Sequence, residues 1–336
     1  MNKASTSSAQ RVAVIGAGAW GTTLSILLAE KGHEVTLWVY EKELASQMQK
    51  SRENKIFLPG WQLPESIEIS PEAEKTEDAQ FFIFVVPTQF LRSVAKRFKK
   101  IIKSSSIAIA ASKGIEEKSL KLPLEILKEE LKTNKLSVLS GPNLSAEIAK
   151  GLPAASVIAS ENLEVASLVQ QLLMLERFRI YVNNDPTGVQ LGGALKNIIA
   201  IAAGVADGLD LGNNAKAALL IRGISEITRL GIAMGANPKT FAGLSGMGDL
   251  ITTCSSKLSR NHYVGEQIAK GKKLSNILAS MKDVAEGVPT AKAALSLGEK
   301  HQVPLPVTKE VFEVLYQGKN PFRSISDLMT RTPTSE

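Results

Sequence analysis

Lys196 is the residue of this sequence whose surroundings point most directly to chemistry. It is the only charged residue between Asp185 and Asp207. Positions 188, 192, 200, 204 and 208 are all Gly or Ala, and at helical spacing they share the row of Lys196. A buried, unpaired ammonium is costly, so we expect a ligand or partner for it, and a pKa low enough for it to donate and accept a proton. The competing interpretation is a lysine that extends to solvent.

A glycine-rich turn, GAGAWG, follows the β-branched run Arg11 to Ile15 and precedes a helical pattern. In this GxGxxG spacing Gly16 permits a tight turn, Gly18 lets backbone amides approach a pyrophosphate, and Gly21 lets helix and strand touch. Glu41 lies twenty residues after Gly21, where an acid can bind the adenosine ribose. No GK[ST] follows, which excludes a phosphate-binding loop of that type. The motif predicts a dinucleotide site, and the alternative is a purely structural glycine turn.

Two further motifs follow apolar runs that read as strands. Lys113, in SKG, comes after Ile107 to Ala111, and SGPN, with Gly141 and Asn143, comes after Leu136 to Leu139. Ligands of parallel sheets bind at the carboxyl ends of the strands, where these residues should emerge. Gly141 and Asn143 could then offer donors to a bound oxygen. The alternatives are a solvated lysine and an ordinary turn.

The second half of the chain carries GLSGMGDL, in which three glycines precede Asp249, and ten residues later Ser259, Arg260 and Asn261. An arginine flanked by a hydroxyl and an amide suits a phosphate, because its planar fork and its neighbours can together meet several oxygens. The alternatives are an exposed arginine in a polar loop and, for Asp249, a helix N-cap.

The expected elements place these residues in two domains. Short apolar runs separated by charged helical stretches, such as Leu120 to Lys132, suit a parallel sheet covered on both faces. The first helix is expected at Thr22 to Glu30. Strands are expected at Arg11 to Ile15, Glu34 to Trp38, Phe81 to Val86, Ile107 to Ala111, Leu136 to Leu139, Ala155 to Ala159 and Arg179 to Val182.

The predicted fold class is therefore α/β: a Rossmann-type doubly wound parallel sheet over residues 11–185, then an all-α domain over residues 186–332. After Pro186 the β-branched runs give way to Ala, Gly and Leu at helical spacing. The segment Gly188 to Ala206 is apolar enough to suggest a membrane span, but a central lysine costs about 2.5 to 3.5 kcal/mol there. We predict a buried helix, no membrane span, and a flexible tail over residues 1–10.

The amino-acid composition limits the kinds of ligand and partner that we expect for this protein. The net charge of +7 is spread over many helices and aromatic residues are only 5%, so we expect no nucleic acid partner. One cysteine, Cys254, and three dispersed histidines, His33, His262 and His301, predict no metal site and fit a reducing cytoplasm. Cys254 is read as a small buried residue and His262 as a surface residue. A homodimer is compatible with the sequence.

Taken together, these motifs resemble the NAD(P)-dependent glycerol-3-phosphate dehydrogenase family in its bacterial form. The resemblance covers residues 11–325 and rests on GAGAWGT, LPG, VVPT, SKGIE, SGPN, GVQLGGALKNIIAIAAG, NAKAALLIRG, GLSGMGDLITTC, SRN, EG and GKNP. It implies a cofactor site and a substrate site, with Lys196 as the catalytic proton-transfer residue. The implied cofactor contacts are Gly16, Gly18, Ala19, Trp20, Gly21, Tyr40, Lys113, Ser145, Arg260, Val284 and Glu286. The implied substrate contacts are Lys113, Gly141, Asn143, Lys196, Asp249, Ser259, Arg260 and Asn261.

The resemblance implies reversible hydride transfer between NAD(P)H and dihydroxyacetone phosphate, giving glycerol 3-phosphate for phospholipid synthesis. Three positions depart from the family pattern: Asn143 stands where Thr or Ser is usual, Ser145 where Ala is usual, and Tyr40 where His or Arg is frequent. The alternatives are another 2-keto or hydroxyacid reductase and a non-catalytic dinucleotide sensor. Glu41 favours NAD, whereas Lys42 and Arg52 could reach a 2′-phosphate, so NAD or NADP is expected as cofactor.

Overall fold

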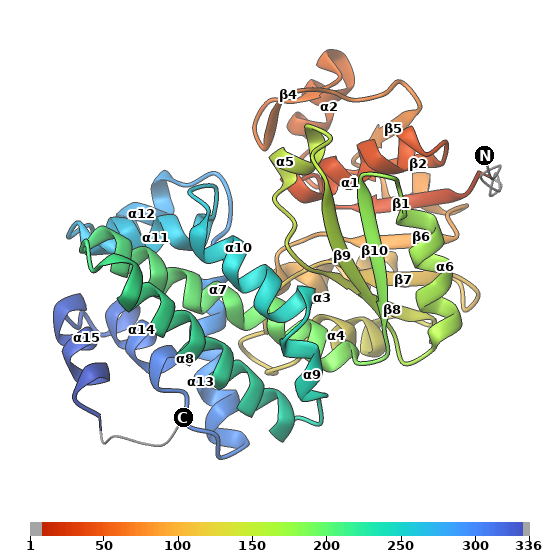
Figure 1. Cartoon of the computed structure of the whole chain (residues 1–336). Helices are drawn as coiled ribbons and strands as arrows, with labels where there is room; N and C mark the ends of the chain where they lie inside the picture. The colour runs from red at the N-terminus through yellow and green to blue at the C-terminus, as the bar shows by residue number, and fades with distance from the viewer. Residues whose placement is uncertain (1–8, 332–336) are drawn as a thin grey trace.

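The computed structural model describes residues 9–331. A twisted sheet with helices on both faces occupies the first part of the chain, and a group of helices follows it (Figure 1). The predicted α/β class with a helical second part is confirmed. Residues 1–8 of the predicted tail lie outside the described residues, whereas the backbone N–H of Gln10 donates to Nδ1 of His33 (3.2 Å).

The main sheet has eight strands in the order β10-β9-β8-β7-β6-β1-β2-β5. Its strands are β1 (Arg11–Ile15), β2 (Glu34–Trp38), β5 (Ile67–Ser70), β6 (Phe81–Phe84), β7 (Ile107–Ala110), β8 (Leu136–Ser140), β9 (Ala154–Ala159) and β10 (Phe178–Asn183). All pairs are parallel except β8 with β9. The prediction of a wholly parallel sheet was therefore wrong at this one pair, because the chain reverses after β8 through a short helix instead of crossing a face of the sheet.

Three strands have no counterpart in the predicted set. Edge strand β5 has the sequence IEIS, in which only the two isoleucines are apolar, although three of the four residues are buried. The hairpin β3 (Glu53–Asn54) and β4 (Leu58–Gln62) is short, and three of the five residues of β4 are exposed. These segments are too short, or too often interrupted by polar residues, to form an apolar run, so the hydrophobic pattern gave no signal there.

The first part also contains seven helical segments. They are α1 (Ala19–Glu30), α2 (Lys42–Ser51), the 3-10 turn η1 (Ala73–Thr76), α3 (Thr88–Phe98), α4 (Pro123–Glu130), α5 (Ser145–Ala149) and α6 (Leu163–Leu173). Alternate residues of β1 enter different cores, Val12 and Val14 packing with α1 and α2, and Ala13 and Ile15 with α3 and α4. This alternation is the consequence of the pleat, and it covers both faces of the sheet.

The second part is helical. Its segments are α7 (Pro186–Gly208), α8 (Gly212–Ala233), α9 (Pro238–Phe241), the π-helical turn η2 (Leu244–Gly248), α10 (Asp249–Ser255), α11 (Arg260–Ala269), α12 (Leu274–Ser280), α13 (Gly287–Lys300), α14 (Pro306–Tyr316) and α15 (Pro321–Met329). Helix α7 lies at its centre and packs against α8, α10, α11 and α13.

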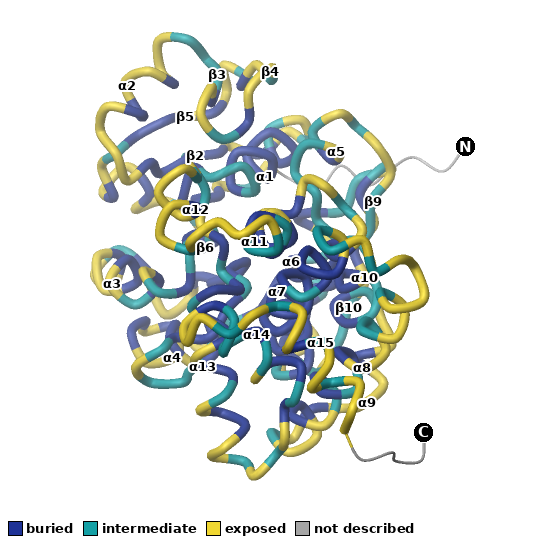
Figure 2. The backbone as a smooth tube through the Cα atoms, turned by 90° about the vertical axis from the view of Figure 1, so that its left-hand side faces the viewer, coloured by how far each residue is buried: buried dark blue, intermediate teal, exposed yellow. Residues whose placement is uncertain are grey.

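Helix α7 is buried along most of its length, as its dark tube in Figure 2 shows. Within the described residues it is long and apolar enough to cross a membrane, but 94% of its most apolar window is buried inside the protein. Its row of small residues has a packing role. A Cβ on Gly192 would lie 2.5 Å from the carbonyl oxygen of Ser245, and one on Gly204 would lie 2.0 Å from that of His262. The glycines thus let η2 and α11 approach α7 on either side of Lys196.

Candidate active site

The glycine turn lies at the carboxyl end of β1 and opens α1. Gly16 has a φ of +114°, and a Cβ on Gly21 would lie 1.9 Å from the carbonyl oxygen of Gly16. A Cβ on Gly18 would meet nothing within 4 Å. The turn is therefore closed on the side of the sheet and open on the side where α1 begins, next to Ala19 and Trp20. A diphosphate fits such a place, because the first amides of a helix have no partner within the helix.

The buried centre of the site joins the two parts of the fold. Asp249, which is 1% exposed, accepts a hydrogen bond from Nζ of Lys196 at Oδ1 (2.6 Å) and another from Nζ of Lys113 at Oδ2 (2.9 Å). Lys113 follows β7, Lys196 lies in α7 and Asp249 begins α10. Lys113 also donates to the carbonyl oxygen of Gly141 (2.8 Å), which follows β8. The structure thus brings four of the predicted substrate residues into one bonded cluster.

The ammonium of Lys196 is buried, and its pKa is lowered to about 8. Burial is the main cause, because it removes water from the charged form, and the nearby charge of Lys113 acts in the same direction. Asp249 opposes both effects. The prediction of a lowered pKa is confirmed, and the alternative of a lysine extending to solvent is wrong. Asp249 is not a cap either, since Gly248 holds that position and the carboxylate is bonded to the lysines.

Thr253 is a member of this cluster that the sequence reasoning missed. Its Oγ1 accepts a hydrogen bond from Nζ of Lys196 (2.6 Å) and donates to Oδ1 of Asp249 (3.2 Å). Thr253 lies four residues after Asp249 on α10. Residues at this spacing share one face of a helix, so the motif GDLITT contained the signal.

Asn261 and Asn197 form a second bonded chain beside the cluster. Nδ2 of Asn197 donates to the carbonyl oxygen of Lys113 (3.1 Å), and its Oδ1 accepts from Nδ2 of Asn261 (2.9 Å). Oδ1 of Asn261 in turn accepts from the backbone N–H of Gly287 (2.9 Å). The side chain of Asn261, predicted as a substrate contact, is therefore engaged within the protein, which leaves its backbone N–H to face a ligand.

The loop after β8 contributes Gly141 and Asn143. A Cβ on Gly141, whose φ is +130°, would lie 3.1 Å from Cα of Ser156. Oδ1 of Asn143 accepts a hydrogen bond from Oγ of Ser156 (2.5 Å), whereas its Nδ2 is buried without a partner among the described residues. Buried donors are normally bonded, so this amide has one hydrogen bond to offer to a ligand.

Ser259 and Arg260 lie at the start of α11. Oγ of Ser259 accepts from the backbone N–H of His262 and so caps the helix. The Arg260 side chain is half exposed, and its Nη1 lies 3.0 Å from Oδ1 of Asp283. The arginine thus lies at the helix N-terminus, and the described residues leave the rest of its guanidinium available to an anion.

Glu286 connects the helical part to the sheet. Its Oε1 accepts from the backbone N–H of Thr88 (2.6 Å), and its Oε2 from that of Lys113 (3.2 Å). Three other predicted cofactor contacts, Val284, Tyr40 and Ser145, take no part in these hydrogen bonds. Val284 and Tyr40 are exposed, and Ser145 begins α5, where its carbonyl oxygen accepts from Oγ1 of Thr23 (3.3 Å).

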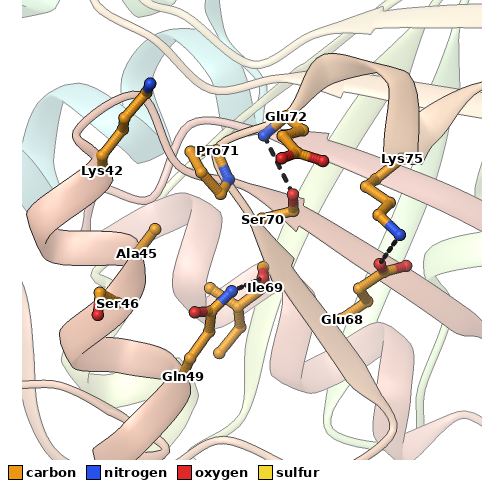
Figure 3. Close-up of a pocket in the computed structure, with 10 residues that line it drawn as sticks. All are labelled: Lys42, Ala45, Ser46, Gln49, Glu68, Ile69, Ser70, Pro71, Glu72 and Lys75. Carbon is orange, nitrogen blue, oxygen red and sulfur yellow. Dashed lines mark hydrogen bonds and ion pairs between the residues drawn. The ribbon is translucent and has the colours of Figure 1, made fainter.

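Arg52 does not reach toward a cofactor phosphate as the sequence suggested. It follows the C-terminal end of α2, about 15 Å along the helix from Lys42 by the helical rise of 1.5 Å per residue. Its Nη2 donates to the carbonyl oxygens of Pro64 and Ile67. Lys42, in contrast to Arg52, is exposed at the start of α2 and lines an open cavity of about 550 Å³ between α2 and the end of β5 (Figure 3).

The predicted burial of Cys254 is confirmed, whereas the predicted exposure of His262 is not. Cys254 is buried, as expected of a small core residue, and burial raises its pKa to about 12. His262 was read as a surface residue, which is wrong, since it is 6% exposed. Within residues 9–331, no group of three or more His, Cys, Asp or Glu side chains is placed to hold a metal ion.

Comparison with known proteins agrees with this geometry. Residues 11–166 match the family model of the NAD-dependent glycerol-3-phosphate dehydrogenase N-terminus, and residues 185–326 match that of its C-terminus. A glycerol-3-phosphate dehydrogenase [NAD(P)+] of Citrifermentans bemidjiense is 47% identical over 98% of this chain and 99% of its own. That of Thermoanaerobacter sp. is 42% identical over 97% and 98%.

Solved structures of glycerol-3-phosphate dehydrogenases are also similar to this chain. The glycerol-3-phosphate dehydrogenase of Coxiella burnetii superposes with a TM-score of 0.93 at 34% identity, over 96% of this chain and 99% of that one. A ketopantoate reductase of Ralstonia eutropha covers 96% of this chain with a TM-score of 0.60 but only 14% identity, so it shares the fold alone. The chain belongs to the NAD-dependent glycerol-3-phosphate dehydrogenase family.

Proposed function

We propose that this protein reduces dihydroxyacetone phosphate to glycerol 3-phosphate with NADH or NADPH, and catalyses the reverse reaction. The observation that carries the proposal is the buried cluster of Lys113, Lys196 and Asp249, placed where the carboxyl edge of the sheet meets α7. It offers one amine that can exchange a proton and a second that can hold an oxygen. The biological role is supply of glycerol 3-phosphate for phospholipid synthesis.

The cofactor belongs along the carboxyl edge of the sheet. The turn at Gly18 has room for the diphosphate, and Glu41, after β2, is exposed where an acid can meet the ribose. When bound, the nicotinamide supplies the hydride. Glu286 holds the backbone of Thr88 and Lys113, so it orients the two loops between which the reacting groups lie.

The substrate belongs between the lysines and α11. The Lys196 ammonium donates its proton to the ketone oxygen during reduction and accepts it back during oxidation. Lys113 and the free Nδ2 of Asn143 stabilise the developing negative charge on that oxygen. The phosphate is bound by the Arg260 guanidinium and by the backbone N–H groups of Arg260 and Asn261, which have no partner among the described residues.

We divide the chain into a cofactor domain, residues 11–185, and a substrate domain, residues 186–332, and we place the protein in the cytoplasm without a membrane span. The burial of α7 supports the last point. A homodimer is also proposed. Ile221 and Ile232 are exposed on the same side of α8, with Ser225 and Thr228 between them, and we propose that a second copy covers them. Light scattering of dilute and concentrated protein tests this.

The test of the activity is the loss of reduced-nicotinamide absorbance with a panel of ketones. We expect turnover of dihydroxyacetone phosphate and very little of dihydroxyacetone. Turnover of ketopantoate or another 2-keto acid instead would show a carboxylate-binding reductase, and cofactor binding without turnover of any ketone would show a sensor.

A further inference from the structure

A single carboxylate oxygen joins three helices behind the start of α11. Nε2 of His262, in the first turn of α11, lies 2.7 Å from Oδ2 of Asp207, near the end of α7. Nζ of Lys216, in α8, donates to the same oxygen (2.6 Å). Burial works against ionisation of Asp207, but the hydrogen bonds from Lys216 and His262 outweigh it, so its pKa lies below the usual value. The carboxylate is therefore charged at neutral pH, and the bonds it accepts are charge-assisted.

The backbone of His262 is fixed as well. Its N–H donates to Oγ of Ser259 (3.2 Å), and its carbonyl oxygen lies against Gly204 of α7, where even a Cβ would be only 2.0 Å away. The residue is thus held at the backbone by the N-cap of its own helix and by α7, and at the ring by α7 again, through Asp207. A shift of the ring would move the turn that contains Arg260 and Asn261, because all of them belong to the same helical turn.

We propose that His262 is a positioning residue for the substrate phosphate: its bond to Asp207 fixes the first turn of α11, and with it the Arg260 guanidinium and the backbone N–H groups of Arg260 and Asn261. This inference rests on the proposed function, which puts the phosphate at that turn. Arg260 is half exposed and bonded only to Asp283 among the described residues, so its own contacts do little to place it. A displacement of about 1 Å in a binding group is enough to cost much of its effect.

A role in proton transfer does not fit the same contacts. The ring bonds to Asp207 through Nε2, and none of its described hydrogen bonds reaches Lys113, Lys196 or Asp249. His262 shares the first turn of α11 with Arg260 and Asn261. Its ring therefore anchors the turn that we propose binds the phosphate, and it does not contact the groups proposed to act on the carbonyl. The expected effect of losing it is therefore on substrate affinity and not on turnover.

The experiment compares His262→Phe with His33→Phe. His33 is a matched control because it is also buried (3% exposed) and hydrogen bonded, through Nε2 to the carbonyl oxygen of Leu172, but it precedes β2 far from α11. We expect His262→Phe to raise the KM for dihydroxyacetone phosphate about tenfold, which corresponds to about 1.4 kcal/mol. The kcat, the KM for NADH and the weak turnover of dihydroxyacetone should stay within threefold. The His33 variant should lose stability without a change in KM.

Two further measurements separate positioning from general damage. Inorganic phosphate, measured by calorimetry, should bind about tenfold more weakly to His262→Phe than to the wild type. His262→Gln should recover most of the affinity, since its amide N–H can replace Nε2 toward Asp207. If His262→Phe does not fold, Asp207→Ala replaces it in the comparison. Asp207→Ala removes the acceptor of the same bond and should raise the KM as His262→Phe would, while His262→Gln remains the variant that keeps the bond.

Folded His262→Phe with phosphate affinity and KM within twofold of wild type would overturn the proposal, as would an equal rise in KM in His33→Phe. The proposed phosphate site is judged separately by Arg260→Ala. If that variant keeps the wild-type KM, the site itself lies elsewhere. If Arg260→Ala raises the KM and the His262 variants do not, only the role of His262 is wrong.

Discussion

Nζ of Lys196 lies 2.6 Å from Oδ1 of Asp249, although 53 residues separate the two in the sequence. The pair is buried, and a carboxylate that already accepts Lys113 cannot fully compensate two ammonium groups. The pKa of Lys196 is consequently lowered to about 8, which leaves the amine able to exist in both forms close to neutral pH.

The first prediction concerns pH. Reduction of the ketone requires the protonated amine, so kcat for dihydroxyacetone phosphate should fall as pH rises through about 8. Oxidation of glycerol 3-phosphate requires the neutral amine, so its kcat should rise through the same pH. Rates measured in both directions under saturating substrate test this. A reduction rate that stays constant well above pH 8 contradicts the assignment.

Removing the amine should abolish most of the turnover. Lys196→Met keeps a long apolar side chain without the proton, so we expect kcat to fall on the order of 10² to 10⁴ from lost acid-base catalysis. Binding of NADH, followed by fluorescence, is the control and should be retained. A kcat within threefold of wild type would refute the role of Lys196.

Removing the phosphate contact should weaken binding of the substrate. Arg260→Ala loses a charge-assisted bond, and we expect a KM for dihydroxyacetone phosphate raised by tenfold or more. Unphosphorylated dihydroxyacetone, which has no group for this site, should be used almost equally by variant and wild type. If both substrates are affected to the same extent, Arg260 supports the fold and not the phosphate.

Cofactor choice should be broad. Glu41 opposes a 2′-phosphate, while Lys42 on the next position favours one, so we expect kcat/KM for NADH and NADPH to differ less than a hundredfold. Lys42→Ala should lower kcat/KM for NADPH more than for NADH. Lys50→Ala, an exposed lysine in the last turn of the same helix, is the control and should change neither. A thousandfold preference of the wild type for one cofactor contradicts this view.

The glycine row of α7 should resist substitution. A Cβ on Gly204 would lie 2.0 Å from the carbonyl oxygen of His262, so Gly204→Ala must move α11 and should cost about 3 kcal/mol or more in the free energy of unfolding. Gly248, with a φ of −60° and no Cβ contact closer than 3.6 Å, is the control and should tolerate Ala. Urea unfolding midpoints measure both, and equal midpoints would show that α11 adapts.

The sequence predicted some features well because they follow from local patterns. β1 and β2 have the predicted bounds, since each begins with an exposed charged residue and continues with mostly apolar, buried residues, as a strand covered on both faces requires. The reversal between β8 and β9 was not predictable in this way, because residue patterns do not encode strand direction and the segment between them contains a helical turn.

The site shows the same division. Lys196 was found because a charge in an apolar run is costly and visible in the sequence. The partner of a buried group is not visible, since Asp249 and Lys113 meet through the packing of distant elements. His262 was misread for that reason: its neighbours in the chain, Asn261 and Tyr263, carry polar groups, and the approach of α7 covers it.

The direction of β9 and β10 also determines where along its length α7 passes the active site. Asn183, the last residue of β10, pairs with Ala159, and Ala159 pairs with Val138, two residues before the end of β8. Helix α7 therefore begins below the carboxyl edge and climbs past it, with Gly193 beside Ser140 and Lys196 about one turn further on. The Lys196 side chain therefore lies in the middle of a 23-residue helix, where fraying of the ends does not reach it. The strand reversal some fifty residues earlier in the chain thus determines which part of α7 faces the carboxyl edge of the sheet.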